Sequence, residues 1–381
     1  MDKLNLINGT AIIAVFVSIL LAIFLITVKT KNKLSNRLFA GFIIFSAIDI
    51  SGFFIYNYIA GYPNIEIFRW TTSLFIMPLF YLYILSVCYA GFKLKPIHLL
   101  HIIPFIVINL VLIPNFYAVA AAQQDYLITH STYNSEMLFF RILTESQFVF
   151  YIAGTFMALK KFQKIYKENY TDGSIITYRW LMQIAFVSLI AHTIVLFKNV
   201  LRYTDNEYVY ILTNVIVSLV ALSILCWCVL KAMYYPDLFR GIDAKLQPLA
   251  ALITNTPIES LNKTELSTEN EQKIKMLKVY MDQEEPYLEP SLTVQDLATQ
   301  MKIPVRDLSI LINHHLDQHF FDFINEYRIN KAMKLLKDPV KVKFTVLEIL
   351  YEVGFNSKSS FNTAFKKYTK LTPTEYRNNS L

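Results

Sequence analysis

The residues best suited to chemistry lie on the polar side of one expected helix near the C-terminus. After Ser357, apolar residues recur every three or four positions, which predicts an amphipathic helix with its apolar side in the core. The opposite side presents hydroxyl, amide and ammonium groups, which can bond the edges of bases or the oxygens of phosphates. This polar side comprises Ser359, Asn362, Thr363 and Lys366, with Lys358 and Lys367 beside it. Residues 341–381 hold seven Lys and Arg against three Asp and Glu, so this end is locally basic.

A second group of candidates consists of ionisable residues inside long apolar runs. Such residues are costly in a membrane and mark functional sites by default. They are Asp49, Arg141, Glu145, His192 and Lys198. One interpretation is a polar pocket, open to the outer side, that binds a signal. The alternative is that Arg141 and Glu145 pair within their own helix as i,i+4 neighbours, and that the others cap or pack helices.

The sequence lacks the motifs of common enzymes. It contains no H-E-x-x-H zinc signature, no G-x-S-x-G nucleophile elbow and no phosphate-binding glycine loop. His314, His315 and His319 lie close together, but no carboxylate or cysteine completes a metal site with them. The three cysteines all lie in apolar segments, so no disulfide framework is implied. We therefore expect no enzyme activity, no metal and no cofactor.

The N-terminal region predicts a polytopic membrane protein. Only 17% of the 381 residues are charged, against about 25% in an average soluble domain. Seven apolar runs approach or exceed the roughly 20 residues that a membrane-spanning helix needs. They cover about 7–28, 38–60, 70–92, 98–117, 137–159, 179–201 and 209–233.

The Lys and Arg counts of the connections predict the orientation of these spans. Residues 29–37 hold four, 93–97 hold two and 160–179 hold five. The alternate connections, 61–69 and 202–208, hold one each, and 115–136 hold none. Because positive charge marks cytoplasmic connections, we expect the N-terminus outside and the chain after the seventh span in the cytoplasm.

Two helix-turn-helix units are predicted in the C-terminal region. The first has a helix over Thr293–Met301, with Thr293 as N-cap, then a turn and a helix from Val305 to about residue 316. The second has a helix over Thr345–Val353, a turn at Gly354 and the amphipathic helix that Ser357 caps. Glycine suits the turn because such turns often need positive φ. A long helix over about 320–336 joins the units.

The second helix of the first unit also has two sides. Leu308, Leu311 and Ile312 form its inward stripe. The side that faces away from the core carries Arg306, Ser309, Ile310 and Asn313.

A connector lies between the two halves. It carries three prolines and a polar run, with one short helix expected around Asp243–Ile253. Ile274, Leu277 and Met281 then form a narrow helical seam, which either pairs with its copy in a homodimer or packs on the domain that follows. The predicted organisation is a transmembrane region over 1–235, a linker with a dimerisation helix over 236–285, and a helix-turn-helix domain over 286–381.

Residues 288–378 resemble the DNA-binding domain of AraC/XylS-type transcription regulators. The resemblance rests on "LTVQDLATQMKIPVRDLSILIN", "FFDFINEYRINKAMKLL" and "ILYEVGFNSKSSFNTAFKKYTKLTPTEYR". It implies two recognition helices in successive major grooves on one face of DNA. It places Arg306, Ser309 and Ile310 in the first groove, and Lys358, Ser359, Ser360 and Thr363 in the second.

Several residues depart from the pattern of that family. Pro304 stands where the family usually has a capping Ser, and Asp307 adds a negative charge to the same helix. Asp317 and Lys370 occupy positions where the family usually has Gly, and Leu350 replaces a small Ala. These departures weaken the expectation of base contacts in the first unit and imply adjusted packing.

Together these observations predict an all-α protein, in which a polytopic seven-helix membrane bundle precedes a cytoplasmic domain with two helix-turn-helix units. The expected function is that of a sequence-specific DNA-binding transcription regulator of the bacterial inner membrane, that is, one-component signalling. The expected partners are double-stranded promoter DNA, the lipid bilayer, RNA polymerase, a second copy in a homodimer, and a small-molecule or envelope signal. One alternative is a transporter or receptor whose cytoplasmic tail docks a protein. Another is a bundle that only anchors the domain.

Overall fold

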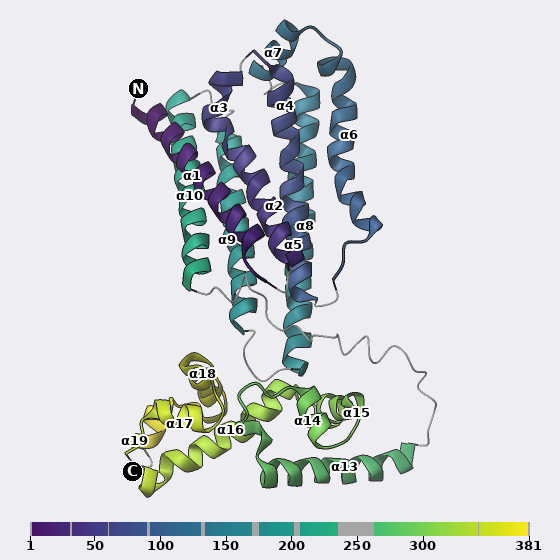
Figure 1. The fold of residues 1–381 in the computed structure, drawn as a ribbon, viewed down its shortest axis with the longest axis vertical. Coiled ribbons are helices and arrows are strands. Elements are labelled where there is room, and N and C mark those ends of the chain that lie inside the picture. Colours follow the sequence, from purple (N-terminus) through teal and green to yellow (C-terminus); the bar gives the residue numbers. More distant parts are fainter. Residues whose placement is uncertain are drawn as a thin grey trace. The chain divides into compact units, whose positions relative to one another are not determined.

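The computed structural model describes residues 2–379 apart from 31–32, 60, 90–91, 131–133, 170–174, 202–205, 235–262 and 342. Every regular element in this described part is a helix, so the predicted all-α class is confirmed (Figure 1). The chain divides into two compact units, residues 1–160 with 177–246 and residues 161–176 with 247–381. The helix expected around Asp243–Ile253 lies outside the described residues.

Seven helices of the N-terminal unit are long and apolar enough to cross a membrane, in the number and order that the sequence predicts. Large apolar side chains point outward from them, and Phe16, Phe150 and Phe197 are each at least 60% exposed. Apolar surface of this extent suits lipid and not water. Length and composition thus indicate a multi-pass membrane protein. The spans cover Leu4–Thr27, Lys33–Ile55, Pro63–Cys88, Pro96–Tyr117, Ser135–Lys164, Tyr178–Leu201 and Tyr208–Tyr234.

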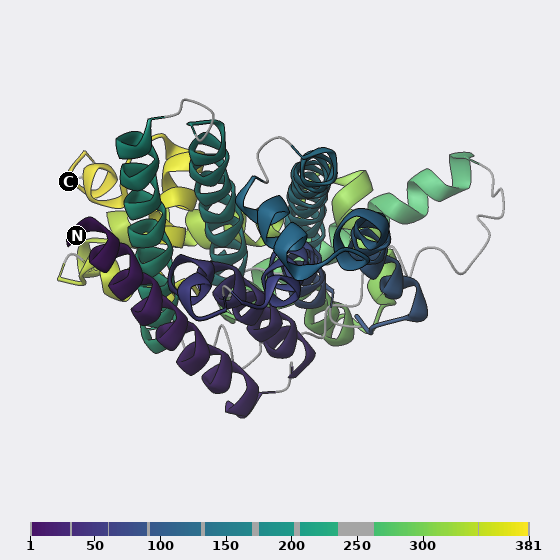
Figure 2. The ribbon, with the colours of Figure 1, turned by 90° about the horizontal axis from the view of Figure 1, so that it is seen from above.

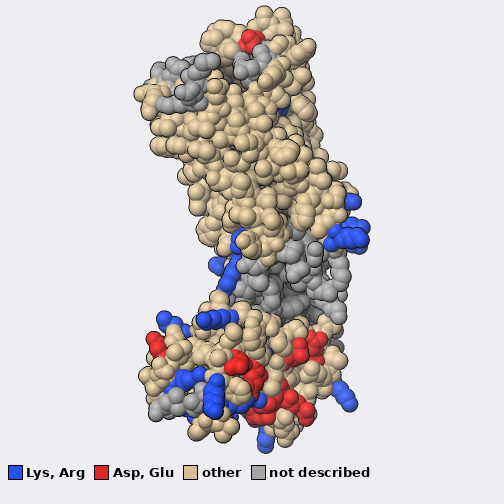
Figure 3. All heavy atoms as spheres, turned by 60° about the vertical axis from the view of Figure 1, so that its left-hand side comes forward, with Lys and Arg blue, Asp and Glu red and all other residues tan. Residues whose placement is uncertain are grey.

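The helices of this unit form a bundle of long, roughly aligned elements. Helix α1 packs against α2 and α10, and α2 packs against α5 (Figures 1 and 2). On the face drawn in Figure 3, Lys and Arg side chains gather at one end of the unit, and the apolar band carries few charges. The elements are α1 (Asp2–Thr27), α2 (Lys33–Ile50), α3 (Gly52–Ile59), α4 (Pro63–Thr72), α5 (Ile76–Cys88), α6 (Ile103–Leu112), α7 (Ala121–Thr129), α8 (Ser135–Asn169), α9 (Ile175–Leu201) and α10 (Glu207–Tyr234).

The C-terminal unit contains the helices predicted for two helix-turn-helix units. The first recognition helix is split, because its second half, Leu311–His315, is a π-helical turn and not a continuation of the α-helix. The other boundaries agree with the prediction to within one or two residues. The elements are α13 (Lys263–Glu284), α14 (Val294–Gln300), α15 (Val305–Ile310), α16 (Phe320–Lys337), α17 (Val346–Glu352), α18 (Lys358–Thr369) and α19 (Pro373–Asn378).

Two apolar cores lie along α16, which runs from the first helix-turn-helix unit to the second (Figure 1). The first core collects residues of α13, α14, α15 and the start of α16, including the inward stripe of Leu308, Leu311 and Ile312. The second core collects the end of α16 with α17 and α18, including Phe361 and Phe365.

The apolar seam of the connector is part of the first core. Leu277 and Met281 are fully buried against the domain, and Ile274 packs beside them. The alternative in which this seam packs on the following domain is therefore confirmed. In this arrangement Leu277 and Met281 face the domain and not a second copy of the chain.

A buried arginine ties the two cores together. Arg328 of α16 has no exposed surface, and its Nε and Nη2 donate to the carbonyl oxygens of Tyr287 and Glu289 at 2.6 and 2.8 Å. Its guanidinium also lies over the ring of Phe355, 5.5 Å from the centroid. Hydrogen bonds that involve a charged group are among the stronger ones in proteins. Arg328 thus links the segment that precedes the first helix-turn-helix unit to the turn of the second unit.

Candidate nucleic-acid interface

The predicted polar side of α18 faces solvent. Ser359, Thr363 and Lys366 are exposed, while Phe361 and Phe365 are fully buried beneath them. Asn362 and Ser360 are half-buried at the margin of this side. The helix therefore separates an apolar underside from a hydroxyl-rich and cationic outer side, as the periodicity predicts. Hereafter Lys358, Ser359, Thr363 and Lys366 are called the α18 face.

Local capping fixes the start of α18. Ser357 is the N-cap, as predicted, and its Oγ accepts a hydrogen bond from the Ser360 backbone N–H at 3.1 Å. The Ser360 hydroxyl lies 2.9 Å from the same Ser357 Oγ. Ser360, which the family resemblance places in the second groove, thus takes part in the cap. This leaves Ser359 as the more accessible hydroxyl of the first turn.

The first helices of the two units begin with the same capping box. Thr293 Oγ1 accepts from the Asp296 N–H at 3.1 Å, and Thr345 Oγ1 accepts from the Glu348 N–H at 3.1 Å. In each case the acidic side chain accepts the N-cap N–H in return. The bonds that Glu348 accepts lower its pKa. The two helix-turn-helix units thus share the same capping arrangement at the start of their first helices.

The outer side of the first recognition helix differs from the prediction at Ser309. Ser309 was expected to face away from the core, but it is only 1% exposed, so this expectation is wrong. It lies next to the buried Leu308 on the helix, and the Asn313 side chain covers it. Asn313 Nδ2 donates to the Ser309 carbonyl oxygen at 3.0 Å and to its Oγ at 2.9 Å. Arg306 and Ile310 are half-buried on this helix.

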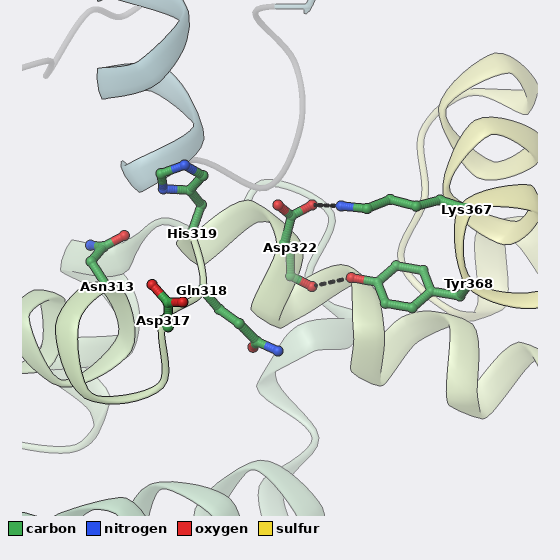
Figure 4. A pocket seen from close by; sticks show the side chains of 7 residues that line it. All are labelled: Asn313, Asp317, Gln318, His319, Asp322, Lys367 and Tyr368. Atoms are coloured by element: carbon green, nitrogen blue, oxygen red, sulfur yellow. Dashed lines mark hydrogen bonds and ion pairs between the residues drawn. The ribbon is translucent and has the colours of Figure 1, made fainter.

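Within the C-terminal unit, a cavity of about 340 Å³ lies between the two helix-turn-helix units (Figure 4). On its α18 side, the Lys367 ammonium forms an ion pair with Asp322 at 2.6 Å, and Tyr368 Oη donates to the Asp322 carbonyl oxygen at 2.9 Å. Burial raises the pKa of Tyr368 above its ordinary value. Sequence reasoning missed Asp322 because its partners lie 45 and 46 residues away. The lining residues are Asn313, Asp317, Gln318, His319, Asp322, Lys367 and Tyr368.

Comparison with known proteins supports the domain assignment. The family described as "Helix-turn-helix domain" matches residues 297–379. The Msm operon regulatory protein of Streptococcus mutans is 27% identical over 133 residues, which are 34% of this chain and 44% of that protein. The melibiose operon regulatory protein of Escherichia coli K12 is 30% identical over 87 residues, 23% of this chain and 28% of that protein. The C-terminal region is an AraC-type helix-turn-helix domain.

The curated relatives match about a quarter to a third of this chain. A transcriptional regulatory protein of Bacillus subtilis, YesN, is 33% identical over 90 residues, 23% of this chain and 24% of that protein. The chain thus spans less than half the length of these curated relatives. No solved structure matches the chain.

The backbone of the AraC-type domain explains two departures from the family pattern. Asp317 and Lys370 stand where the family usually has Gly, and both adopt positive φ, 50° and 65°. Gly354 does so as well, at 86°. The special backbone geometry is thus kept where the glycine has been replaced. Leu350, which replaces a small Ala of the family pattern, is fully buried in the second core.

The structure brings together Glu145 and His192 of the predicted signal pocket. His192 Nε2 of α9 lies 2.7 Å from Glu145 Oε2 of α8. The His192 ring stacks on Phe148, with ring centroids 3.5 Å apart. Lys198 lies over the ring of Phe53, 5.9 Å from the centroid. Arg141 lies one helical turn before Glu145 on α8. The pocket as a whole remains a prediction.

Asp49 and its surroundings differ from the sequence interpretation. Asp49 was placed near the middle of the second span, but it is exposed in the last turn of α2, where the helix breaks before α3. Its carbonyl oxygen accepts a hydrogen bond from Arg69 at 2.9 Å. Arg69 also donates to Glu66 at 2.6 and 2.9 Å, and Trp70 donates to the same carboxylate at 2.6 Å. Glu66 is 4% exposed, and the sequence analysis missed it.

Proposed function

We propose that this protein is a membrane-bound, sequence-specific DNA-binding transcription regulator that couples a stimulus at the membrane to promoter binding. The observation that carries the proposal is the solvent-facing polar side of α18 in an AraC-type domain, on the same chain as seven apolar helices. Regulatory proteins with this domain in other bacteria support the same function. The proposed partners are double-stranded promoter DNA, the bilayer and RNA polymerase.

The α18 face supplies two kinds of contact in this proposal. Lys358 and Lys366 neutralise phosphates, which fixes the register of the domain on DNA without reading the sequence. Ser359 and Thr363 are short side chains that reach base edges from a helix lying in the major groove. Arg306, Ile310 and Asn313 of the first unit approach the neighbouring groove.

A salt-titrated gel shift tests direct DNA binding. Residues 263–381, which contain both apolar cores, are purified and used to select binding sites from random DNA. We expect Lys366→Gln to reduce the slope of log affinity against log salt by about 0.9, since each phosphate contact contributes about that much. Ser359→Ala with Thr363→Ala is expected to relax the selected sequence instead.

The matched control for Lys366 is Lys278, an exposed lysine on α13 that is remote in sequence from the recognition helices. Lys278→Gln should leave both slope and sequence preference unchanged. If no DNA is retarded at low salt, or if Lys278→Gln and Lys366→Gln behave alike, direct binding through the α18 face is wrong. Failure of DNA retardation would support a tail that docks a protein.

We further propose that the N-terminus lies outside the bacterial inner membrane and the AraC-type domain lies in the cytoplasm. The Lys and Arg counts of the connections support this orientation. Protease added to spheroplasts should leave a C-terminal epitope intact until the membrane is permeabilised. Loss of the epitope on intact spheroplasts would contradict the orientation.

A further inference from the structure

An open groove of about 590 Å³ lies between α9 and α10 in the N-terminal unit. Its walls are mainly apolar and aromatic, and among the described residues that line it none is acidic. The lining residues are Tyr178, Arg179, Met182, Gln183, Phe186, Val187, Ile190, Trp227 and Lys231.

The groove has one cationic end and one apolar end. Arg179 lies in the first turns of α9 and Lys231 in the last turn of α10, so both cations belong to the same end of this antiparallel pair. From there Met182, Phe186 and Ile190 follow one another at every fourth position of α9. At 1.5 Å per residue, Ile190 lies about 16 Å along the helix from Arg179. The groove therefore matches an amphiphile with an anionic head and an apolar chain.

The wall formed by Trp227 is held in place by an aromatic stack. Trp227 packs on Trp180 with ring centroids 5.2 Å apart. Trp180 is 2% exposed, and its Nε1 donates to Tyr83 Oη at 2.9 Å. Tyr83 in turn stacks on Phe39 with centroids 4.6 Å apart. This stack fixes the Trp227 wall of the groove, which reduces the cost of ordering it when a ligand binds.

Water is a poor occupant of the apolar part of this groove. Phe186 and Ile190 are 49% and 59% exposed, although they lie inside a predicted membrane span. An acyl chain would cover these side chains, and tryptophan and tyrosine at the charged end suit the level of lipid head groups. The two cations at that level complement a phosphate.

We propose that the groove between α9 and α10 binds an anionic phospholipid. Its phosphate lies at Arg179 and Lys231, and one acyl chain lies along Met182, Phe186 and Ile190. This inference rests on the membrane location in the proposed function, and it names a ligand class for the membrane half. Helix α10 is the last of the seven spans before the AraC-type domain in sequence, so occupancy of the groove bears on the span that precedes that domain.

Native mass spectrometry of the purified full-length protein tests the site. The protein is titrated with phosphatidylglycerol and with phosphatidylcholine that carry the same acyl chains. Each cation near the membrane surface contributes about a fivefold preference for anionic lipid, so the parent should prefer phosphatidylglycerol by about 25-fold. Arg179→Gln with Lys231→Gln should bring the two affinities to within about twofold of each other.

The control pair is Lys93→Gln with Lys95→Gln, which removes the same charge from a connection that does not line the groove. This pair should keep the preference, and so should the conservative pair Arg179→Lys with Lys231→Arg. Equal affinity of the parent for both lipids, or a preference that survives Arg179→Gln with Lys231→Gln, would overturn the site. The assay contains no DNA, so its result does not depend on whether the protein binds DNA. Recovery of the full-length protein in the soluble fraction would overturn both the membrane location and the lipid site.

Discussion

Replacement of Gly354 by alanine is expected to destabilise the AraC-type domain strongly. Gly354 forms the turn between α17 and α18 at φ 86°, where L side chains are strained. A Cβ at this position would meet the carbonyl oxygens of Leu288 and Tyr287 at 2.7 and 2.8 Å. Backbone atoms cannot turn aside as a flexible side chain can. The Tyr287 oxygen also accepts the 2.6 Å hydrogen bond from Arg328, so displacing it weakens that bond as well.

The size of the effect follows from three contributions. The left-handed conformation costs a side chain about 1–2 kcal/mol. The forced shift of the 287–288 backbone costs about 1–3 kcal/mol, as overpacking does elsewhere. Loss of unfolded-state entropy on replacing glycine returns about 0.4–1 kcal/mol. The free energy of unfolding should therefore fall by about 1–5 kcal/mol, a substantial part of the roughly 5–15 kcal/mol expected for such a domain.

Urea unfolding of residues 263–381, followed by circular dichroism, measures this change. With an m-value of about 2 kcal/mol per molar, the midpoint should fall by about 0.5–2.5 M. Gly354→Asn separates the contributions, because Asn tolerates positive φ better than Ala but carries the same Cβ. Contact with the carbonyl oxygens predicts that both variants are destabilised. The exposed Ser359→Ala, as control, should change stability by less than about 0.5 kcal/mol. A midpoint for Gly354→Ala within about 0.3 M of the parent would refute the reasoning.

Three further predictions concern the same domain. Lys370 ends α18 at φ 65°, so Lys370→Gly should raise the free energy of unfolding by about 0.5–1 kcal/mol, measured as a higher urea midpoint; a lower midpoint would contradict it. Asp322 forms an ion pair with Lys367 at 2.6 Å. Asp322→Asn should free the Lys367 ammonium to bind phosphate, which steepens the slope of log affinity for DNA against log salt by about 0.9. An unchanged slope would count against this prediction. The hydrogen bond from Lys331 lowers the pKa of Glu285. The pair therefore stabilises the fold at pH values above the ordinary glutamate pKa, and this contribution is lost as the pH falls through the lowered pKa of Glu285. Glu285→Gln should therefore flatten the loss of stability between about pH 5 and about pH 3 in urea titrations, and an equally steep loss would show that the pair contributes nothing.

The helices and their caps could be predicted because they depend on residues close together in the chain. The hydroxyls of Thr293 and Ser357 cap helices within three residues of themselves. Gly354 marks its turn because glycine adopts positive φ without strain, and its φ is 86°. The membrane spans need only an unbroken apolar run of sufficient length. Such local signals do not depend on the tertiary arrangement, and the structure follows them closely.

Contacts between distant residues could not be predicted in the same way. Arg328 lies in a polar sequence and is suited to solvent by type. Its partners are nevertheless carbonyl oxygens about 40 residues earlier, and no side-chain pattern marks a backbone acceptor. Arg69 counted only as a charge in a connection, whereas it donates to the carbonyl oxygen of Asp49, 20 residues earlier. Ser309 is an exception among local contacts, because periodicity does not encode that the Asn313 side chain bonds it one helical turn away.

The two helix-turn-helix units offer different surfaces to DNA, although they share a local plan. Helix α18 begins at a serine cap and exposes short hydroxyl side chains. Helix α15 begins at Pro304, which offers no side-chain cap, and carries Asp307 in its first turn, where its charge opposes phosphate. Its predicted hydroxyl, Ser309, is buried. Because base contacts specify and phosphate contacts position, we expect the second unit to supply most of the sequence discrimination. Arg328 contacts both units, through the Tyr287 carbonyl oxygen and the Phe355 ring, so we expect the register that α18 adopts on DNA also to set where α15 meets the neighbouring groove.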